Sequence, residues 1–369
     1  MSPKPRVIHF VTGGGSGATK VALEIACGHL RTGNFEPLLL LRRKRAPLPA
    51  TMQAQITATG LRTAWVDRGF FSGTTLRQLT ATIAEFKPQL FVAHGNSEHL
   101  WGRQAAFSAG VPAVIHVEQN CERYPFWRRW AARKLAARTS ATVCVSQGVA
   151  DHIQPLGLSG PRLDIIHNGV EAARYSVGAP SFAARSQDII MVARFARQKD
   201  QPTLIRAAKR LVDGGWTGQL MLGGDGRAAH RRACEKLVVK LGLVGRVEFL
   251  GRVADAAPLY HRCRVAVLST HYEGLPLVLI DYMAAGCAAV GSEAPGVTDI
   301  IAPGVNGWRF PHGDDAALAQ TLRAVLAGGP TIEAIVARGH ADAPARFSLG
   351  KMLARHEALY RELLAGAVK

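Results

Sequence analysis

Two carboxylates stand eight positions apart in the segment THYEGLPLVLID, residues 270–281. Glu273 follows an apolar run, residues 264–269, that is typical of a buried parallel strand, and Pro276 is well placed as the first residue of a helix. The free N–H groups at the start of such a helix can bind a phosphate. Asp281 would lie about 1.4 turns into the helix. This spacing suits the chemistry of a sugar nucleotide.

Two cations share the loop that follows another predicted strand, residues 188–193. Arg194 and Lys199 are separated there by residues 195–198. Two positive charges held on one loop at the carboxyl end of a strand can neutralise a diphosphate without a metal ion. No Asp-x-Asp triad occurs in the sequence. We therefore expect neither a metal nor another cofactor.

Three glycine turns follow predicted strands. The loop of residues 12–17 contains Gly14 and Gly15 and precedes a helix, so its backbone could approach a phosphate. It matches neither the nucleotide-binding loop that ends in Lys-Ser/Thr nor the complete G-x-G-x-x-G dinucleotide pattern. The turn at residues 222–226 contains Gly224 and would let backbone approach a nucleotide. Gly251 ends the next predicted strand, and Arg252 follows it.

Polar residues also follow two strands of the first half. His116 closes the segment PAVIHV, where an imidazole could contact a sugar hydroxyl or a forming alkoxide. A histidine at the end of a strand can equally be structural. The further candidates for contacts with an acceptor are His94, Asn96, Glu98, Glu118 and Asn120.

Short apolar runs alternate with amphipathic segments along the whole chain, which is the pattern of βα units around parallel sheets. The predicted strands of the first half are residues 6–11, 36–41, 62–66, 89–93, 112–117, 141–146 and 162–167. Those of the second half are residues 188–193, 219–224, 246–251, 264–269 and 287–292. The sequence thus predicts an α/β protein with two doubly wound, Rossmann-like domains that face each other across a cleft.

The 369 residues suffice for two domains of ordinary size. We place the first domain at residues 1–172, an interdomain hinge at 173–187, the second domain at 188–348 and a last amphipathic helix at 349–369. No apolar run is long enough to span a membrane. The six cysteines are scattered without metal-ligand spacing, which favours reduced thiols in a cytoplasmic protein.

Together these motifs resemble the retaining glycosyltransferases of family 4, which have the GT-B fold. The resemblance is strongest over residues 143–310. In that family the first domain mainly holds the acceptor and the second the nucleotide, and the last helix returns to the first domain. The family motif is Glu, seven residues, Glu, so Asp281 is one methylene shorter than the family residue.

The resemblance also implies roles for individual residues. Glu273 would bind donor-sugar hydroxyls and Asp281 the ribose, while Arg194 and Lys199 would bind the diphosphate. Together with His116, the residues Glu273, Arg194 and Lys199 make up the predicted catalytic set. The remaining donor contacts are expected at Gly14, Gly15, Gly224, Gly251, Arg252, Gly274, Leu275, Pro276 and Leu277. The base is expected to meet backbone atoms, so UDP and GDP donors both remain open, with UDP favoured.

The net charge of +18 indicates an anionic partner or aids solubility. Within residues 124–138 no acid occurs, and five basic residues alternate with apolar ones. The basic residues are Arg128, Arg129, Arg133, Lys134 and Arg138, and the apolar ones are Phe126, Trp127, Trp130 and Leu135. Such a helix can lie on an anionic membrane, or it can be an ordinary packing helix with a solvated basic face. Nucleic acid is not expected, because no zinc-finger, RNP or basic-zipper pattern is present.

Taken with these residues, the resemblance implies a metal-independent, retaining hexosyltransferase that transfers a sugar from a nucleotide diphosphate to a glycan or lipid-linked acceptor. The expected setting is the synthesis of lipopolysaccharide, O-antigen or capsule-type polysaccharide at the inner membrane face. One alternative is a sugar-nucleotide 2-epimerase with the same fold. A second alternative is a non-catalytic protein that binds anionic surfaces.

Overall fold

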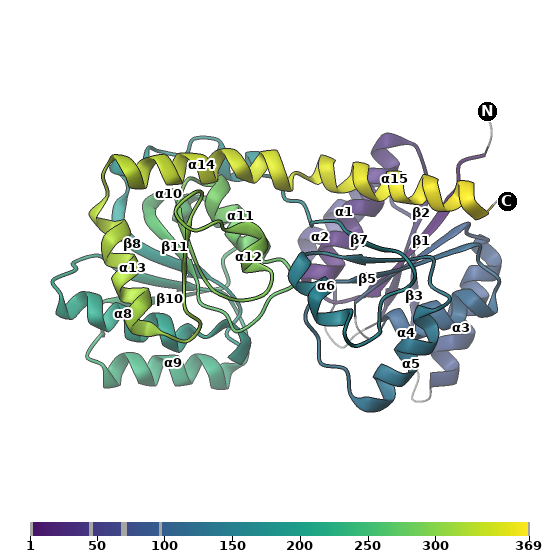
Figure 1. Ribbon diagram of the computed structural model, residues 1–369, viewed down its shortest axis with the longest axis horizontal. Coiled ribbons are helices and arrows are strands. Elements are labelled where there is room, and N and C mark those ends of the chain that lie inside the picture. The colour runs from purple at the N-terminus through teal and green to yellow at the C-terminus, as the bar shows by residue number, and fades with distance from the viewer. Residues whose placement is uncertain (1–2, 44–46, 68–71, 96–97, 368–369) are drawn as a thin grey trace. The chain divides into compact units, whose positions relative to one another are not determined.

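The computed structural model describes residues 3–43, 47–67, 72–95 and 98–367 of the chain. They form two units, one of Met1–Gly169 with Leu349–Lys369 and one of Val170–Ser348 (Figure 1). Each unit contains a parallel sheet with helices on both of its faces.

The first unit contains a seven-stranded sheet in the order β3-β2-β1-β4-β5-β6-β7. Every neighbouring pair is parallel, and the central strands are almost completely buried, as expected for a sheet covered on both sides. The strands are β1 (Arg6–Thr12), β2 (Glu36–Arg42), β3 (Thr63–Val66), β4 (Leu90–His94), β5 (Ala113–Glu118), β6 (Ala141–Cys144) and β7 (Leu163–Ile165).

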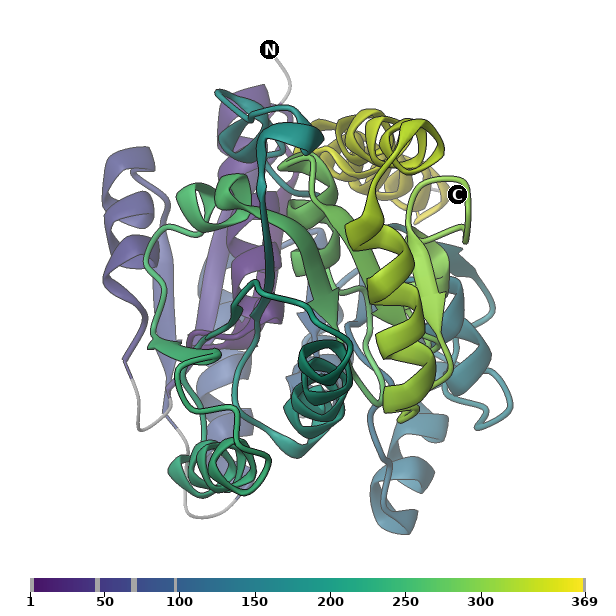
Figure 2. The same cartoon turned by 90° about the vertical axis from the view of Figure 1, so that its left-hand side faces the viewer.

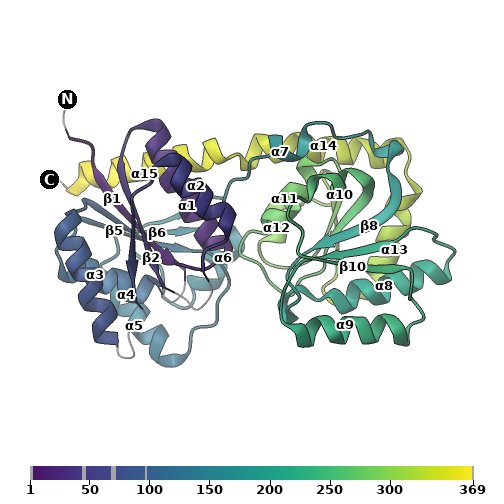
Figure 3. The ribbon, with the colours of Figure 1, turned by 180° about the vertical axis from the view of Figure 1, so that it is seen from behind.

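Helices α1, α2 and α15 lie on one side of this sheet, and α3, α4 and α5 lie on the other (Figure 3). The chain's last helix, α15, packs on α1, so the carboxyl-terminal segment is part of the first unit. The helices of this unit are α1 (Gly17–Thr32), α2 (Ala50–Thr59), α3 (Ser72–Phe86), α4 (Glu98–Ser108), α5 (Phe126–Ala136), α6 (Gln147–Ile153) and α15 (Leu349–Ala367).

The second unit contains a six-stranded parallel sheet in the order β10-β9-β8-β11-β12-β13. The order reverses at β8, so the loops after β8 and β11 leave toward opposite faces, which is where open α/β sheets bind ligands. The strands are β8 (Ser186–Val192), β9 (Leu220–Gly223), β10 (Val247–Gly251), β11 (Cys263–Leu268), β12 (Ala288–Ser292) and β13 (Trp308–Phe310).

Helices cover both faces of this second sheet (Figure 2). Helix α8 packs against α9 and α13, whereas α11 packs against α14 and α7. The helices are α7 (Ala173–Ser176), α8 (Gln201–Asp213), α9 (Ala228–Lys240), α10 (Ala257–Arg262), α11 (Leu277–Ala284), α12 (Val297–Ile300), α13 (Asp315–Ala327) and α14 (Pro330–Phe347), with two short 3-10 turns at Phe182–Ala184 and Arg197–Lys199.

The predicted α/β class with two doubly wound units is confirmed, and all twelve predicted strands are present with small shifts at their ends. Strand β13 was not predicted. The two units divide after Gly169, three residues before the predicted end of the first domain at 172. Residues 173–187, predicted as a hinge, lie in the second unit and include α7 and the buried Arg185, whose guanidinium donates to four backbone carbonyls.

Candidate functional site

Lys199 and Glu273 meet in the second unit. Lys199 lies on the loop after β8, and Glu273 lies on the loop after β11, the neighbouring strand. The Lys199 ammonium forms an ion pair with Glu273 Oε1, and the glutamate is only 7% exposed. The sequence predicted both residues but not their contact. A buried carboxylate and its cation are therefore held at the carboxyl edge of the sheet.

Hydroxyl and amide groups fix the Glu273 carboxylate. Thr270 Oγ1 donates to Glu273 Oε1 at 2.8 Å, and Gln198 Nε2 lies 3.4 Å from Oε2. Ser292, at the end of β12, accepts the Thr270 N–H at 2.9 Å and donates to the Thr270 carbonyl at 2.6 Å. Three neighbouring strand ends thus hold the carboxylate in one orientation, as a preorganised site requires.

Helix α11 begins at Leu277, and Pro276 is its N-cap residue, so the prediction that Pro276 is the first helical residue was wrong by one position. The buried Tyr282 anchors this helix, because its hydroxyl accepts the Val192 N–H at 2.8 Å. The segment Gly274–Leu277 therefore joins the Glu273 loop directly to the start of α11, which is the arrangement the sequence predicted for oxygen-binding N–H groups.

Gly296 allows the Glu273 loop to pack closely. A Cβ at this position would lie 2.3 Å from the Gly274 carbonyl oxygen, and its φ of +80° is a conformation that glycine favours. Sequence reasoning missed Gly296, although the Pro295-Gly296 dipeptide is a recognisable turn signal.

Asp281 is half-buried on α11, which packs against α7, and its carboxylate lies near the Tyr175 hydroxyl of α7. Burial raises the pKa of Tyr175, and the nearby Asp281 charge raises it further. The phenol therefore stays a donor at neutral pH. The shorter acid thus has a protein partner that the sequence did not reveal, and its contact with a ribose stays a prediction.

Arg194 and Arg252 are exposed. The guanidinium of Arg194 has no ion pair within the part of the chain that the structure describes, so it is free to meet an anion. Gly224 packs beside this loop, since a Cβ there would lie 2.2 Å from the Ala193 carbonyl oxygen. Its N–H donates to the Gly251 carbonyl at 2.6 Å. Gly224 and Gly251 therefore join the loops after β8, β9 and β10.

In the first unit, Gly14 and Gly15 lie between β1 and α1, as predicted. Gly14 is buried and Gly15 is exposed. Ser16 caps α1 by accepting the Thr19 N–H at 3.2 Å, and Thr19 in turn donates to the Thr12 carbonyl at 2.9 Å. The loop is thus closed by its own side chains, and its contact with a donor stays a prediction.

His116 is completely buried, and its ring stacks on His99 with 4.2 Å between centroids. Glu118 lies 3.6 Å from His116 Nε2 and accepts a hydrogen bond from Tyr124. Burial raises the pKa of Glu118 to about 7, while it lowers the pKa of His116. His116 and Glu118 therefore belong to an internal polar network, and their contact with substrates stays a prediction.

The other acceptor candidates also make internal contacts. His94 is fully buried and lies 3.1 Å from His9, nitrogen to nitrogen. Glu98 forms an ion pair with Arg42 at 2.7 Å. The Asn120 side chain accepts the Cys121 N–H at 3.0 Å. Asn96 lies outside the described residues. None of these acceptor contacts is tested by the structure.

Comparison with known proteins identifies the family. A model described as Glycosyltransferase Family 4 matches residues 15–174, and one described as Glycosyl transferases group 1 matches residues 186–328. The putative glycosyltransferase EpsD of Bacillus subtilis is 30% identical over 269 residues, which are 67% of this chain and 69% of EpsD. The chain belongs to the family 4 glycosyltransferases.

A second relative of this family 4 glycosyltransferase is the lipopolysaccharide core biosynthesis glycosyltransferase LpsE of Rhizobium meliloti. It is 29% identical over 216 residues, which cover 57% of this chain and 61% of LpsE. The match therefore spans less than two thirds of LpsE. The resemblance predicted from the sequence is confirmed at the level of the family.

Among solved structures, HepE from Anabaena in complex with UDP superimposes with a TM-score of 0.85 at 18% identity, and the match covers 97% of this chain and all of HepE. HepE has also been solved with UDP-glucose, with a TM-score of 0.84. This likeness shows the fold, and the predicted GT-B architecture is confirmed. No helix within the described ranges is both long and apolar enough to cross a membrane.

Proposed function

We propose that this chain is a retaining, metal-independent glycosyltransferase that moves a hexose from a nucleotide diphosphate, with UDP favoured, to a glycan or lipid-linked acceptor. The observation that carries the proposal is the Lys199–Glu273 pair on adjacent strand ends, beside the start of α11. The name of LpsE supports a role in cell-surface polysaccharide synthesis, and the UDP-glucose bound by HepE supports a UDP-sugar as the donor.

In the proposed mechanism Glu273 holds donor-sugar hydroxyls while Arg194 and Lys199 face the diphosphate. Charge develops on that diphosphate as the bond to the sugar breaks, and two fixed cations stabilise it. The departing diphosphate oxygen accepts the acceptor proton on the same face of the sugar, which leaves the anomeric configuration unchanged. No protein base is needed, which is consistent with the burial of His116 and Glu118.

The proposal is tested by a thermal-shift screen with UDP, GDP, ADP and their sugars. A UDP-sugar at 100 times its Kd should add about 2.7 kcal/mol to the free energy of unfolding. Transfer to an acceptor, with the anomeric configuration of the product read by NMR, then tests retention. Stabilisation by no nucleotide would overturn the proposal. Interconversion of the free sugar nucleotide without acceptor would favour the 2-epimerase.

Activity should survive EDTA, because Arg194 and Lys199 supply the positive charge that a metal would otherwise give to the diphosphate. The measurement is the rate at saturating donor before and after removal of divalent ions. Complete loss of activity that magnesium or manganese restores would contradict this prediction.

Asp281 should contribute to donor affinity. Loss of a hydrogen bond to a charged group costs about 1.5 to 3 kcal/mol, so Asp281→Ala should weaken donor binding by roughly 10 to 150-fold. The rate at saturating donor should change less, because the ribose is remote from the reacting bond. Calorimetric titration with the donor measures this affinity.

Tyr175→Phe is the matched control, since it removes the hydroxyl near Asp281 and leaves the carboxylate in place. Its donor affinity should stay near that of the parent. Asp281→Glu tests whether the shorter side chain of Asp281 can reach the ribose. If the backbone of α11 lies as in the family, this variant should bind the donor at least as tightly as the parent protein. Equal affinities for the Ala, Glu and parent proteins would show that Asp281 only holds α7.

The proposed cellular place is the cytoplasmic face of the inner membrane, with α5 as the contact. Phe126, Trp127 and Trp130 are 87%, 59% and 57% exposed, while α5 packs inward through Ala132, Leu135 and Ala136. Lys134 and Arg128 lie over the exposed rings of Trp130 and Trp127. Exposed aromatic and basic residues on one helix suit an anionic bilayer surface.

Replacing Trp127 and Trp130 by Ser and Arg128 and Lys134 by Gln should weaken binding to anionic vesicles, since each basic residue near such a surface contributes about 1 kcal/mol. The measurement is sedimentation with vesicles over a range of salt concentrations. The control, Lys236→Gln with Lys240→Gln on the basic helix α9, should bind like the parent. If the parent, the α5 variant and the α9 control sediment equally with the vesicles, the exposed face of α5 is only solvated and does not bind the membrane.

A further inference from the structure

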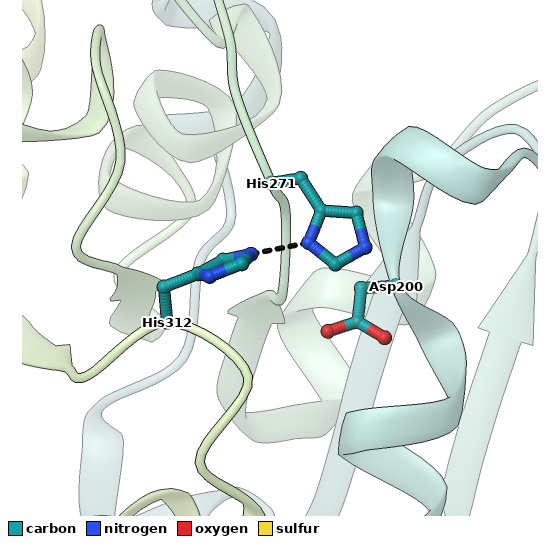
Figure 4. A group of neighbouring side chains, drawn as sticks. All are labelled: Asp200, His271 and His312. Carbon is teal, nitrogen blue, oxygen red and sulfur yellow. Dashed lines mark hydrogen bonds between the residues drawn. The ribbon is translucent and has the colours of Figure 1, made fainter.

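Three potential metal ligands meet in the second unit beside the Lys199–Glu273 pair. Asp200, His271 and His312 each offer one ligand atom, and these atoms all lie within 4.8 Å of one another. Asp200 directly precedes α8, His271 follows β11, and His312 follows β13 (Figure 4). No local spacing in the sequence predicts this cluster, since its members come from three separate loops.

The backbone around the cluster holds the ligands in place. The His271 N–H donates to the Gln198 carbonyl at 2.8 Å, and Ser269 Oγ donates to the Asp200 carbonyl at 3.0 Å. Asp200 has a φ of +43°, a left-handed conformation that is costly for a residue other than glycine. Its side chain does not cap α8. The strained backbone instead leaves the carboxylate beside the two imidazoles.

A further group orients the carboxylate. Thr203 Oγ1 donates to Asp200 Oδ2 at 2.7 Å, which leaves Oδ1 for another partner. Hydrogen bonds of this kind commonly position the ligands of metal sites, and they raise the metal affinity. Thr203 is itself buried on the first turn of α8. The carboxylate is therefore supported from a rigid element.

The two imidazoles face each other through Nδ1 of His271 and Nε2 of His312, which are hydrogen-bonded (Figure 4). Each neutral imidazole has one nitrogen lone pair to offer. A cation in place of the shared proton would take both lone pairs and one carboxylate oxygen. Two imidazoles with a carboxylate suit Zn²⁺ and its neighbours, whereas Ca²⁺ and Mg²⁺ prefer oxygen ligands alone.

We propose that Asp200, His271 and His312 bind one divalent transition-metal cation, with Zn²⁺ as the reference ion. His312 is exposed, so water completes the coordination. The cation joins the loop that carries Lys199, one residue before Asp200, to the loop that carries Glu273, two residues after His271. The cation lies beside the proposed diphosphate contacts. Removing it should destabilise the two loops, while the proposed sugar transfer continues. The site therefore goes beyond the proposed function and does not depend on it.

The test is calorimetric titration of EDTA-treated, dialysed full-length protein with ZnCl₂. We expect one equivalent to bind and the melting temperature to rise with the Zn²⁺ concentration. His271→Ala and His312→Ala should each lose at least about 100-fold in affinity, the upper end of the loss for a residue that only supports a ligand. Thr203→Val, a positioning variant, should lose roughly 10-fold.

His230→Ala is the matched control, because His230 is a partly exposed histidine of α9 in the same unit and outside the cluster. It should bind Zn²⁺ like the parent. Co²⁺ absorption gives a second readout that reports the ligand type, and far-UV circular dichroism shows that each variant is folded. Unchanged Zn²⁺ affinity in both histidine variants, thiolate-to-Co²⁺ charge-transfer bands, or no binding at millimolar Zn²⁺ would each overturn the proposal.

Discussion

Lys199→Ala and Arg194→Ala should each lower the turnover number by about 100-fold or more, the scale of losing one preorganised contact to developing charge. Their effects on stability should differ. Arg194 is exposed and leaves no buried partner behind. Lys199→Ala leaves the carboxylate of Glu273, which is 7% exposed, without its cation. Breaking such a pair costs about 3 kcal/mol, the low end of the range for a buried ion pair.

The double variant Lys199→Ala, Glu273→Gln separates the two effects. Neutralising residue 273 removes the stranded charge, so the free energy of unfolding should recover while turnover stays low. Lys209→Ala is the matched control, since Lys209 is paired with Asp213 on the surface of α8. Such surface pairs contribute little. Rates for Arg194→Ala and Lys199→Ala that both stay within about threefold of the parent would remove these cations from the mechanism.

The strands and the loops at their ends could be predicted because each rests on local pattern. Residues 37–41 within the predicted strand 36–41 are apolar throughout, as is typical of a parallel strand covered on both faces. Strand β13 was not predicted, because Trp308–Phe310 is only three residues long and contains the charged Arg309. Within the predicted hinge, the contacts of Arg185 with backbone carbonyls could not be predicted, because no sequence pattern displays them.

The pairing of side chains could not be predicted, since it depends on loops that the fold brings together. Lys199 and Glu273 are 74 residues apart, and Asp281 meets Tyr175 across two helices. The alternation within α5 allowed either its aromatic or its small residues to face inward. The structure buries Ala132 and Ala136 and leaves the tryptophans outside.

Acid should unfold the first unit before the second. Six buried histidines have pKa values lowered below the ordinary 6.5, mainly by burial, and all belong to the first unit. They are His9, His29, His94, His99, His116 and His356. The pKa falls to about 4 for His29 and to about 3 for His94 and His356. Several of these rings also contact each other, such as His9 and His29 at 5.3 Å between centroids.

The free energy of unfolding should fall with falling pH because the two states take up protons differently. As the pH falls below about 6.5, the unfolded chain binds protons at these histidines and the folded chain does not. Each histidine therefore lowers the free energy of unfolding by up to about 1.4 kcal/mol per pH unit until its folded pKa is reached. Glu118 opposes this. Its pKa is raised to about 7, so its folded form gains a proton first and stability rises as the pH falls from about 7 toward the ordinary value.

Because six histidines act against one glutamate, the free energy of unfolding of the first unit should fall as the pH falls below about 6.5. Urea unfolding between pH 7 and 5, with hydrogen exchange followed by mass spectrometry, assigns the loss to one unit. The pair His9→Asn, His94→Gln removes two titrating rings from one contact, so the slope should become shallower whatever the stability at pH 7. His230→Gln, on the second unit, should leave the slope unchanged.

A free energy of unfolding that is flat from pH 7 to 5, or earlier exchange in residues 170–348, would show that these histidines accept protons within the fold.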